Sequence, residues 1–207
     1  MLKRTKGLLL LSLLVITGMA GTVDTGTISK KERKTALALL KESRADLFRD
    51  VRGLSEAQLN FKPAADRWSV KECVYHIAIS EKNLWDFIQK SMNEPANPEK
   101  RSEIKVTDEQ LVKMMENRDY KVKTAEPFEP KNTPYKSLED ALNDFRERRA
   151  DHIRYVRSTT EDLRNHVLQM PFGYLDCYQA CLMLGAHANR HIQQLNEVKA
   201  DPNFPKQ

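Results

Sequence analysis

The sequence has little glycine, few cysteines and no long one-letter tract. Its 207 residues include seven glycines, nine prolines and three cysteines. No repeat period is visible, so collagen-like and low-complexity classes are excluded. With 40% apolar residues, a chain of this length is expected to form one packed core and not to be disordered throughout.

A cluster of basic residues is also missing. The formal charge is +5, from 34 Lys and Arg against 29 Asp and Glu, and it falls to +2 without Lys3, Arg4 and Lys6 at the N-terminus. The other positive residues alternate with acidic ones, as in Lys41-Glu42. Nucleic-acid binding requires clustered positive charge, so no nucleic-acid partner is expected.

Residues 1–20 are typical of a secretory signal peptide. A basic start is followed by an apolar run over 8–16 and by small residues at Gly18 and Ala20, in the order that a signal peptidase reads. The run is shorter than the roughly 20 residues that cross a bilayer, so no stable membrane span is expected; an uncleaved anchor is the alternative. We expect cleavage after Ala20, a linker over residues 21–28 and export to the periplasm or extracellular space.

The three cysteines are Cys73, Cys177 and Cys181. An odd number leaves at least one thiol unpaired within the chain. Cys177 and Cys181 are four apart on a predicted helix, where disulfide geometry is poor. Two alternatives stay open: a bridge from Cys73 to either of them, or three buried thiols that act as small hydrophobic side chains.

Two capping boxes begin the first long helices. Ser29 and Ser69 are each followed three residues later by a glutamate, which is the pattern of a capped helix N-terminus. Apolar residues at helical spacing then predict helices over about 30–53 and 70–92. One further short helical turn is expected after Ser55.

Two more long amphipathic helices follow a long connection. Ser137 and Asp176 begin these helices, and between the two a turn is expected near Pro171 without convincing strands. The connection over residues 93–136 holds five prolines and one short helix that opens at Thr107.

These signals predict an all-α protein. Four long helices between residues 29 and 200 form a four-helix bundle domain, and residues 201–207 form a C-terminal tail. The long crossover between core helices two and three allows consecutive core helices to lie parallel, so an up-down-up-down order is not required.

Three histidines are candidates for a metal site. His187 and His191 are four residues apart and share the inward face of the last helix, and His76 lies at the border of the inward face of the second. Three imidazoles with an open fourth position are typical of catalytic metal sites, whereas the alternative is a set of buried structural histidines. His152 is either a fourth ligand or a structural histidine, and His166 receives no role.

Two charged residues fall in the middle of apolar helix faces. Glu81 on the second helix and Arg149 on the third are expected to pair across the bundle, because isolated buried charges are very costly. The alternatives are that helix rotation turns one of them to solvent, or that Arg148 takes the place of Arg149.

Three segments of the sequence resemble a known family. Residues 68–72 read WSVKE, residues 76–81 read HIAISE and residues 187–194 read HANRHIQQ. Together they resemble the DinB-like (DinB/YfiT-like) metalloenzyme superfamily, over about residues 30–200. The resemblance implies a four-helix bundle of unusual connectivity with a divalent metal held by three histidines.

The resemblance also implies which residues form the site. The metal ligands fall on His76, His187 and His191, and Gln194 matches the trailing glutamine that supports them. Imidazole ligands suit Zn, Ni, Fe or Cu. No catalytic residue is assigned, since the position of Glu81 indicates a structural role.

The predicted function is that of an exported metal-dependent hydrolase, because a metal held by three imidazoles generates hydroxide or polarises a carbonyl. The alternatives are a metal-dependent thiol transferase or isomerase, which the resemblance also implies, and a non-enzymatic bundle that binds a metal or ligand. The substrate is an unidentified small molecule, and a homodimer stays open.

Overall fold

The computed structural model describes residues 27–121 and 123–206. The predicted signal peptide and most of the linker lie outside these ranges. Within them, no helix is both long and apolar enough to cross a membrane. The elements in chain order are α1 (Lys30–Val51), α2 (Glu56–Asn60), α3 (Val70–Met92), η1 (Pro98–Glu103), α4 (Asp108–Glu116), η2 (Glu126–Phe128), η3 (Pro130–Asn132), α5 (Leu138–Ser158), β1 (Val167–Met170), β2 (Gly173–Asp176) and α6 (Cys177–Lys199).

The long helices begin where their capping residues predict. Ser29 and Ser69 each accept a hydrogen bond from the backbone N–H three residues later, and the glutamate at that position accepts one from the cap backbone in return. Asp176 forms the same reciprocal box at the start of α6. Because each box satisfies backbone donors that have no partner inside the helix, these residues determine where α1, α3 and α6 start.

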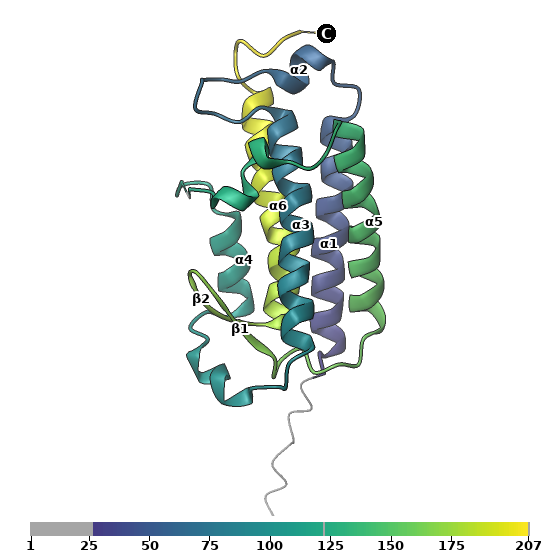
Figure 1. The fold of residues 1–207 in the computed structure, drawn as a ribbon, viewed down its shortest axis with the longest axis vertical. Coiled ribbons are helices and arrows are strands. Elements are labelled where there is room, and N and C mark those ends of the chain that lie inside the picture. The colour runs from purple at the N-terminus through teal and green to yellow at the C-terminus, as the bar shows by residue number, and fades with distance from the viewer. Residues whose placement is uncertain (1–26, 122, 207) are drawn as a thin grey trace, which may run out of the picture.

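Four helices form the bundle, which confirms the predicted all-α class (Figure 1). Each of α1 and α3 packs against both α5 and α6. The crossover between α3 and α5 carries α4 back along the outside of α6, so that α3 and α5 run in the same direction (Figure 1). The parallel arrangement that the long crossover allows is therefore present.

A short hairpin corrects the expectation that the chain lacks strands. β1 and β2 pair antiparallel, with Val167 opposite Asp176 and Met170 opposite Gly173. The predicted turn near Pro171 connects them, and Gly173 adopts a φ of +135° that favours glycine. Strands of four residues are too short to show a clear alternation in sequence.

The core consists of two apolar clusters that are separated along the bundle axis. On α5, Phe145 belongs to one cluster and Ile153 to the other. Arg149 lies midway between them and is fully buried. A polar layer thus crosses the middle of the apolar core. The three cysteines are buried and free, as in the alternative that treats them as small hydrophobic side chains.

Candidate metal centre

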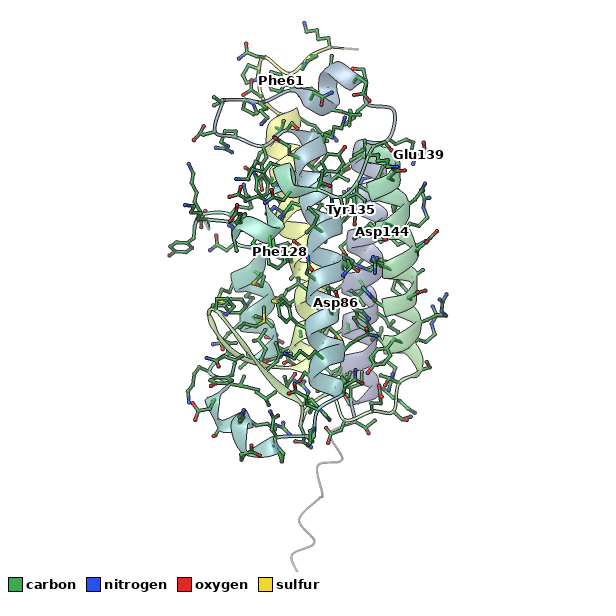
Figure 2. All side chains as sticks on the ribbon, in the orientation of Figure 1. Phe61, Asp86, Phe128, Tyr135, Glu139 and Asp144 are labelled. Atoms are coloured by element: carbon green, nitrogen blue, oxygen red, sulfur yellow. The ribbon has the colours of Figure 1, made fainter. Side chains whose placement is uncertain are left out.

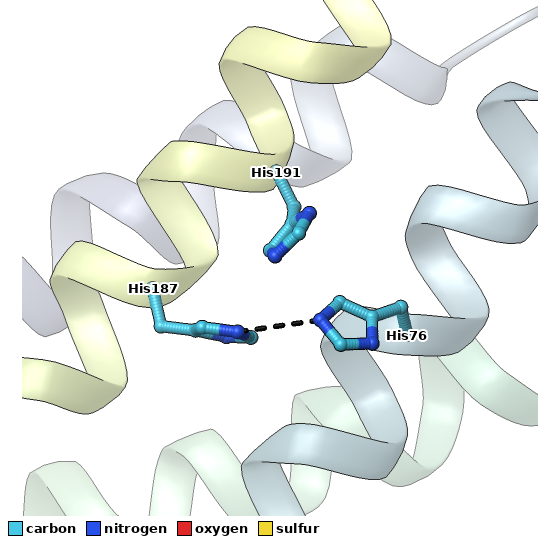
Figure 3. Close-up of side chains that lie close together, drawn as sticks. All are labelled: His76, His187 and His191. Atoms are coloured by element: carbon cyan, nitrogen blue, oxygen red, sulfur yellow. Dashed lines mark hydrogen bonds between the residues drawn. The ribbon is translucent and has the colours of Figure 1, made fainter. Parts of the chain in front are cut away.

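The structure brings His76, His187 and His191 together. One ring nitrogen of each lies within 4.8 Å of the corresponding atoms of the other two. Figure 3 shows His187 and His191 on α6 pointing toward His76 on α3. The ring centroid of His76 lies 5.0 Å from the ring centroid of His187 and 4.2 Å from that of His191. Because α3 and α6 pack directly on each other, ligands that are over 100 residues apart in sequence form one cluster.

Neighbouring groups orient two of the imidazoles. Nδ1 of His76 lies 2.8 Å from the carbonyl oxygen of Phe128, and Nδ1 of His191 lies 2.9 Å from Oε1 of Gln194. Both oxygens only accept hydrogen bonds, so each Nδ1 carries the proton and each Nε2 keeps its lone pair. Lone pairs held in this way are those that coordinate a metal.

The aromatic ring of Trp68 fixes the same two histidines from the side. Its centroid lies 4.9 Å from that of His76 and 5.8 Å from that of His191. Trp68 directly precedes the N-cap of α3, so the capping box that starts the helix also positions the ring. The contact limits the rotation of both imidazoles.

Burial keeps the cluster neutral. Removal from water lowers the pKa of His76 to about 4 and that of His187 to about 3. Burial also lowers the pKa of His191 well below its ordinary value, and its two histidine neighbours add to the effect. Neutral imidazoles are the form that binds metal, so the cluster is in its ligating state at neutral pH.

The distances and donors suit a divalent transition metal. Nε2 of His76 and Nε2 of His187 are 3.3 Å apart. Two imidazoles bound to one tetrahedral ion at about 2.0–2.1 Å place their nitrogens about 3.3–3.4 Å apart. His76 and His187 therefore already have the spacing that a tetrahedral ion requires, and the nitrogen of His191 lies within 4.8 Å of theirs. Among the described residues the group has three ligands, so a tetrahedral ion bound there would have a fourth position for water or substrate.

The metal-free protein is expected to lose stability as the pH falls from about 7.5 to about 5. The unfolded chain protonates its histidines near pH 6.5, whereas the buried His76 and His187 stay neutral down to about 4 and about 3. The unfolded state therefore binds more protons, and the free energy of unfolding falls by up to about 1.4 kcal/mol per pH unit for each histidine. Urea unfolding of chelator-treated protein measures this loss.

A matched variant assigns the effect to the cluster. His76→Gln removes one of these groups and is expected to make the pH dependence shallower over the same range. Carboxylates contribute little there, because the range lies above their ordinary pKa of about 4. A free energy of unfolding that stays constant between about pH 7.5 and about pH 5 contradicts the prediction.

Glu81 and Arg149 meet in the polar layer. Nε and Nη2 of Arg149 each donate a hydrogen bond of 2.6 Å to one oxygen of the Glu81 carboxylate. Burial raises the pKa of Glu81, but the Arg149 guanidinium outweighs it and holds this pKa at about 2. Both carboxylate oxygens are occupied, which fits the structural role predicted for Glu81 and leaves it unsuited to act as a base.

His152 belongs to the polar layer and not to the metal cluster. Its Nδ1 lies 2.7 Å from Oε1 of Glu81, and its ring stacks on Trp85 at a centroid distance of 4.0 Å. The fourth-ligand alternative is therefore wrong. Arg148, the other candidate partner of Glu81, instead contacts Asp144 at 2.8 Å near the surface. His166 lies within hydrogen-bonding distance of the backbone oxygen of Ser91.

An open cleft reaches the histidine cluster at His191. It has a volume of about 600 Å³, and Trp68, His191 and Gln194 form part of its wall. The loop before α3, the crossover and α6 supply its lining. Clefts of this size bind small molecules.

One important contact at this site has no signal in the sequence. The Phe128 carbonyl that orients His76 belongs to η2 in the crossover, beside α3 (Figure 2). A backbone oxygen is present at every residue, so the sequence contains no signal for its role. Gln194, which does carry a signal, contacts His191 directly.

The fold and the site define an all-α bundle protein with a candidate three-histidine metal centre. The chain belongs to the DinB superfamily, whose sequence profile matches residues 39–195. This confirms the family that the three sequence segments indicate.

Two proteins from Bacillus subtilis are similar to the chain. The uncharacterized protein YuaE of strain 168 is 26% identical over 165 residues, which are 79% of this chain and 96% of that protein. The solved structure of YfiT is 20% identical and superposes with a TM-score of 0.58, covering 84% of this chain and 89% of that chain. YfiT is described as a probable metal-dependent hydrolase with an unusual four-helix bundle topology, and at this identity the likeness establishes the fold.

Proposed function

We propose that the protein is an exported metal-dependent hydrolase that acts on a small molecule. The observation that carries the proposal is the cluster of three neutral imidazoles, of which His191 also lines an open cleft. A closed structural zinc site has four protein ligands, whereas a catalytic site keeps one position open. The description of YfiT as a probable metal-dependent hydrolase supports the same class of reaction.

The chain's own residues hold and orient the ion. His76, His187 and His191 are the proposed ligands, and their donor set suits Zn, Ni or Fe. The Phe128 carbonyl and the Gln194 amide keep the Nε2 lone pairs of two of them directed at the ion. The bound ion supplies Lewis-acid activation of water or of a carbonyl. Trp68 restricts movement of the rings, so the ligands are pre-organised.

Protein purified from its native compartment tests the proposal. Elemental analysis is expected to find about one equivalent of a divalent transition metal, and the intact mass is expected to correspond to a chain that starts after Ala20.

The metal-loaded protein is then expected to hydrolyse members of a panel of esters and amides. Metal without turnover supports the non-enzymatic alternative, and turnover only in the presence of a thiol supports the transferase alternative. An N-terminal Met1 on most molecules contradicts cleavage.

A further inference from the structure

Basic side chains outnumber acidic ones in the lining of the cleft. Seven basic and four acidic side chains line it. Three of the acidic groups already have basic partners within the cleft: Lys62 binds Glu72 at 2.7 Å, Lys131 binds Glu129 at 2.6 Å and Arg118 binds Glu197 at 3.0 Å. The positive charge in the cleft therefore exceeds what its own acidic groups balance.

Among the basic residues of the cleft, Arg190 is buried. It directly precedes His191, is 7% exposed and lines the cleft. Its guanidinium donates to the backbone oxygens of Asn117 and Tyr120, which leaves three of its five N–H groups for other acceptors. Among the described residues, no carboxylate forms an ion pair with it. A buried cation without an anionic partner is costly, and an anionic ligand supplies that partner.

Two lysines add to this charge. Lys121 and Lys123 line the same cleft, and neither forms an ion pair within the described part of the chain. Asp66 is the acidic lining residue without a basic partner there. Two lysines and Arg190 against one aspartate leave an excess of positive charge. A cleft lined by charge of one sign concentrates ligands of the other sign.

The proposed metal increases the preference for anions. Three neutral imidazoles contribute no negative charge, so a divalent ion bound to them would keep its full charge of about two beside His191, which lines the cleft. Within the described ranges, no carboxylate belongs to the histidine cluster. Metal and cleft therefore attract the same kind of ligand.

We infer that the cleft binds a small molecule that carries an oxyanion group, a carboxylate or a phosphoryl group, which Arg190 contacts with Lys121 and Lys123 beside it. Guanidinium groups bind both kinds of oxyanion through paired hydrogen bonds. A volume of about 600 Å³ accommodates such a molecule. That the anion is part of a hydrolysed substrate rests on the proposed function, whereas the anion site itself does not.

Calorimetric titration of the full chain tests the inference. The probes are succinate, inorganic phosphate and the neutral succinamide, each added to the metal-loaded and to the metal-free protein. We expect succinate or phosphate to bind at least about 10-fold more tightly than succinamide. The tighter of the two anions identifies the oxyanion as a carboxylate or as a phosphoryl group.

Three variants locate the site. Arg190→Gln is expected to lose the preference for anions while it keeps its metal. The double variant Lys121→Gln/Lys123→Gln is expected to weaken anion binding several-fold, and it leaves the bonds from Arg190 to the crossover untouched. Lys41→Gln removes one positive charge, as Arg190→Gln does, from an exposed residue of α1 outside the cleft, and it is expected to bind like the wild type.

The outcomes separate the two proposals. Equal affinity for all three probes overturns the anion site, and so does an anion preference that persists in both cleft variants, because the metal alone then accounts for it. If the wild type takes up no metal, the proposed hydrolase is wrong. The comparison of succinate with succinamide on the metal-free protein still decides the anion site in that case.

Discussion

The Arg149→Met variant is expected to unfold with a free energy about 3–5 kcal/mol lower than the wild type. Arg149 uses all five of its N–H donors, in bonds to the Glu81 carboxylate, the Ser43 hydroxyl and the carbonyls of Leu40 and Leu184. Methionine fills much of the volume but leaves the carboxylate of Glu81 buried without its cation. Urea unfolding with far-ultraviolet circular dichroism measures the loss.

The neighbouring residue provides the control. Arg148 pairs with Asp144, and both side chains are about one-third exposed. Arg148→Met is expected to cost less than about 1 kcal/mol, because exposed ion pairs contribute little. If the free energies of unfolding of the two variants differ by less than about 1 kcal/mol, the buried bonds of Arg149 do not stabilise the bundle more than the surface pair does. Should Arg149→Met fail to fold, Arg149→Lys provides the measurement, since it keeps the charge and loses the bidentate contact.

The His187→Ala variant is expected to lose the metal, and with it any hydrolytic activity. Only two of the three imidazoles remain, and two neutral nitrogens do not hold the ion against water and buffer. Metal content is expected to fall from about one equivalent to near zero after reconstitution and desalting. Metal is also expected to raise the melting temperature of the wild type, because it joins α3 to α6, and to leave that of the variant unchanged.

Two other histidines serve as controls. His166→Ala removes an imidazole whose Nδ1 lies 2.8 Å from the backbone oxygen of Ser91, and it is expected to retain metal. His152→Ala removes a partner of Glu81, so it is expected to lower stability and also retain metal. Equal metal in the wild type and in His187→Ala, or none in either after reconstitution with several divalent ions, rejects the site.

Sequence patterns predicted the fold well because its helix starts are determined locally. The capping boxes at Ser29 and Ser69 need only residues three apart, and the apolar periodicity between them extends over several turns. The hairpin after α5 was missed because each of its strands has four residues, too few to separate alternation from chance. The end of α1 was also predicted two residues late, at position 53 instead of Val51.

The candidate site was predictable where side chains on regular helices carry it. Helical angles placed His187, His191 and Glu81 on inward faces, and the structure brings each of them against the expected helix. The same angles left His152 ambiguous, because a position on a face does not determine which neighbour it meets. The cleft was beyond sequence reasoning, since Arg190 on α6 and Lys121 in the crossover become neighbours only through the irregular path of that crossover.

The polar layer also has a consequence for how the protein folds and opens. The bonds of Arg149 join it to partners between 35 and 109 residues away in sequence, on α1, α3 and α6. A state in which any one of these helices has detached leaves part of the guanidinium without acceptors, so partly docked bundles are unfavourable. We therefore expect folding to be cooperative across all four helices and slowed by the closure of long loops. We expect α6 to open only together with the whole bundle, so that His187 and His191 keep their places between binding events.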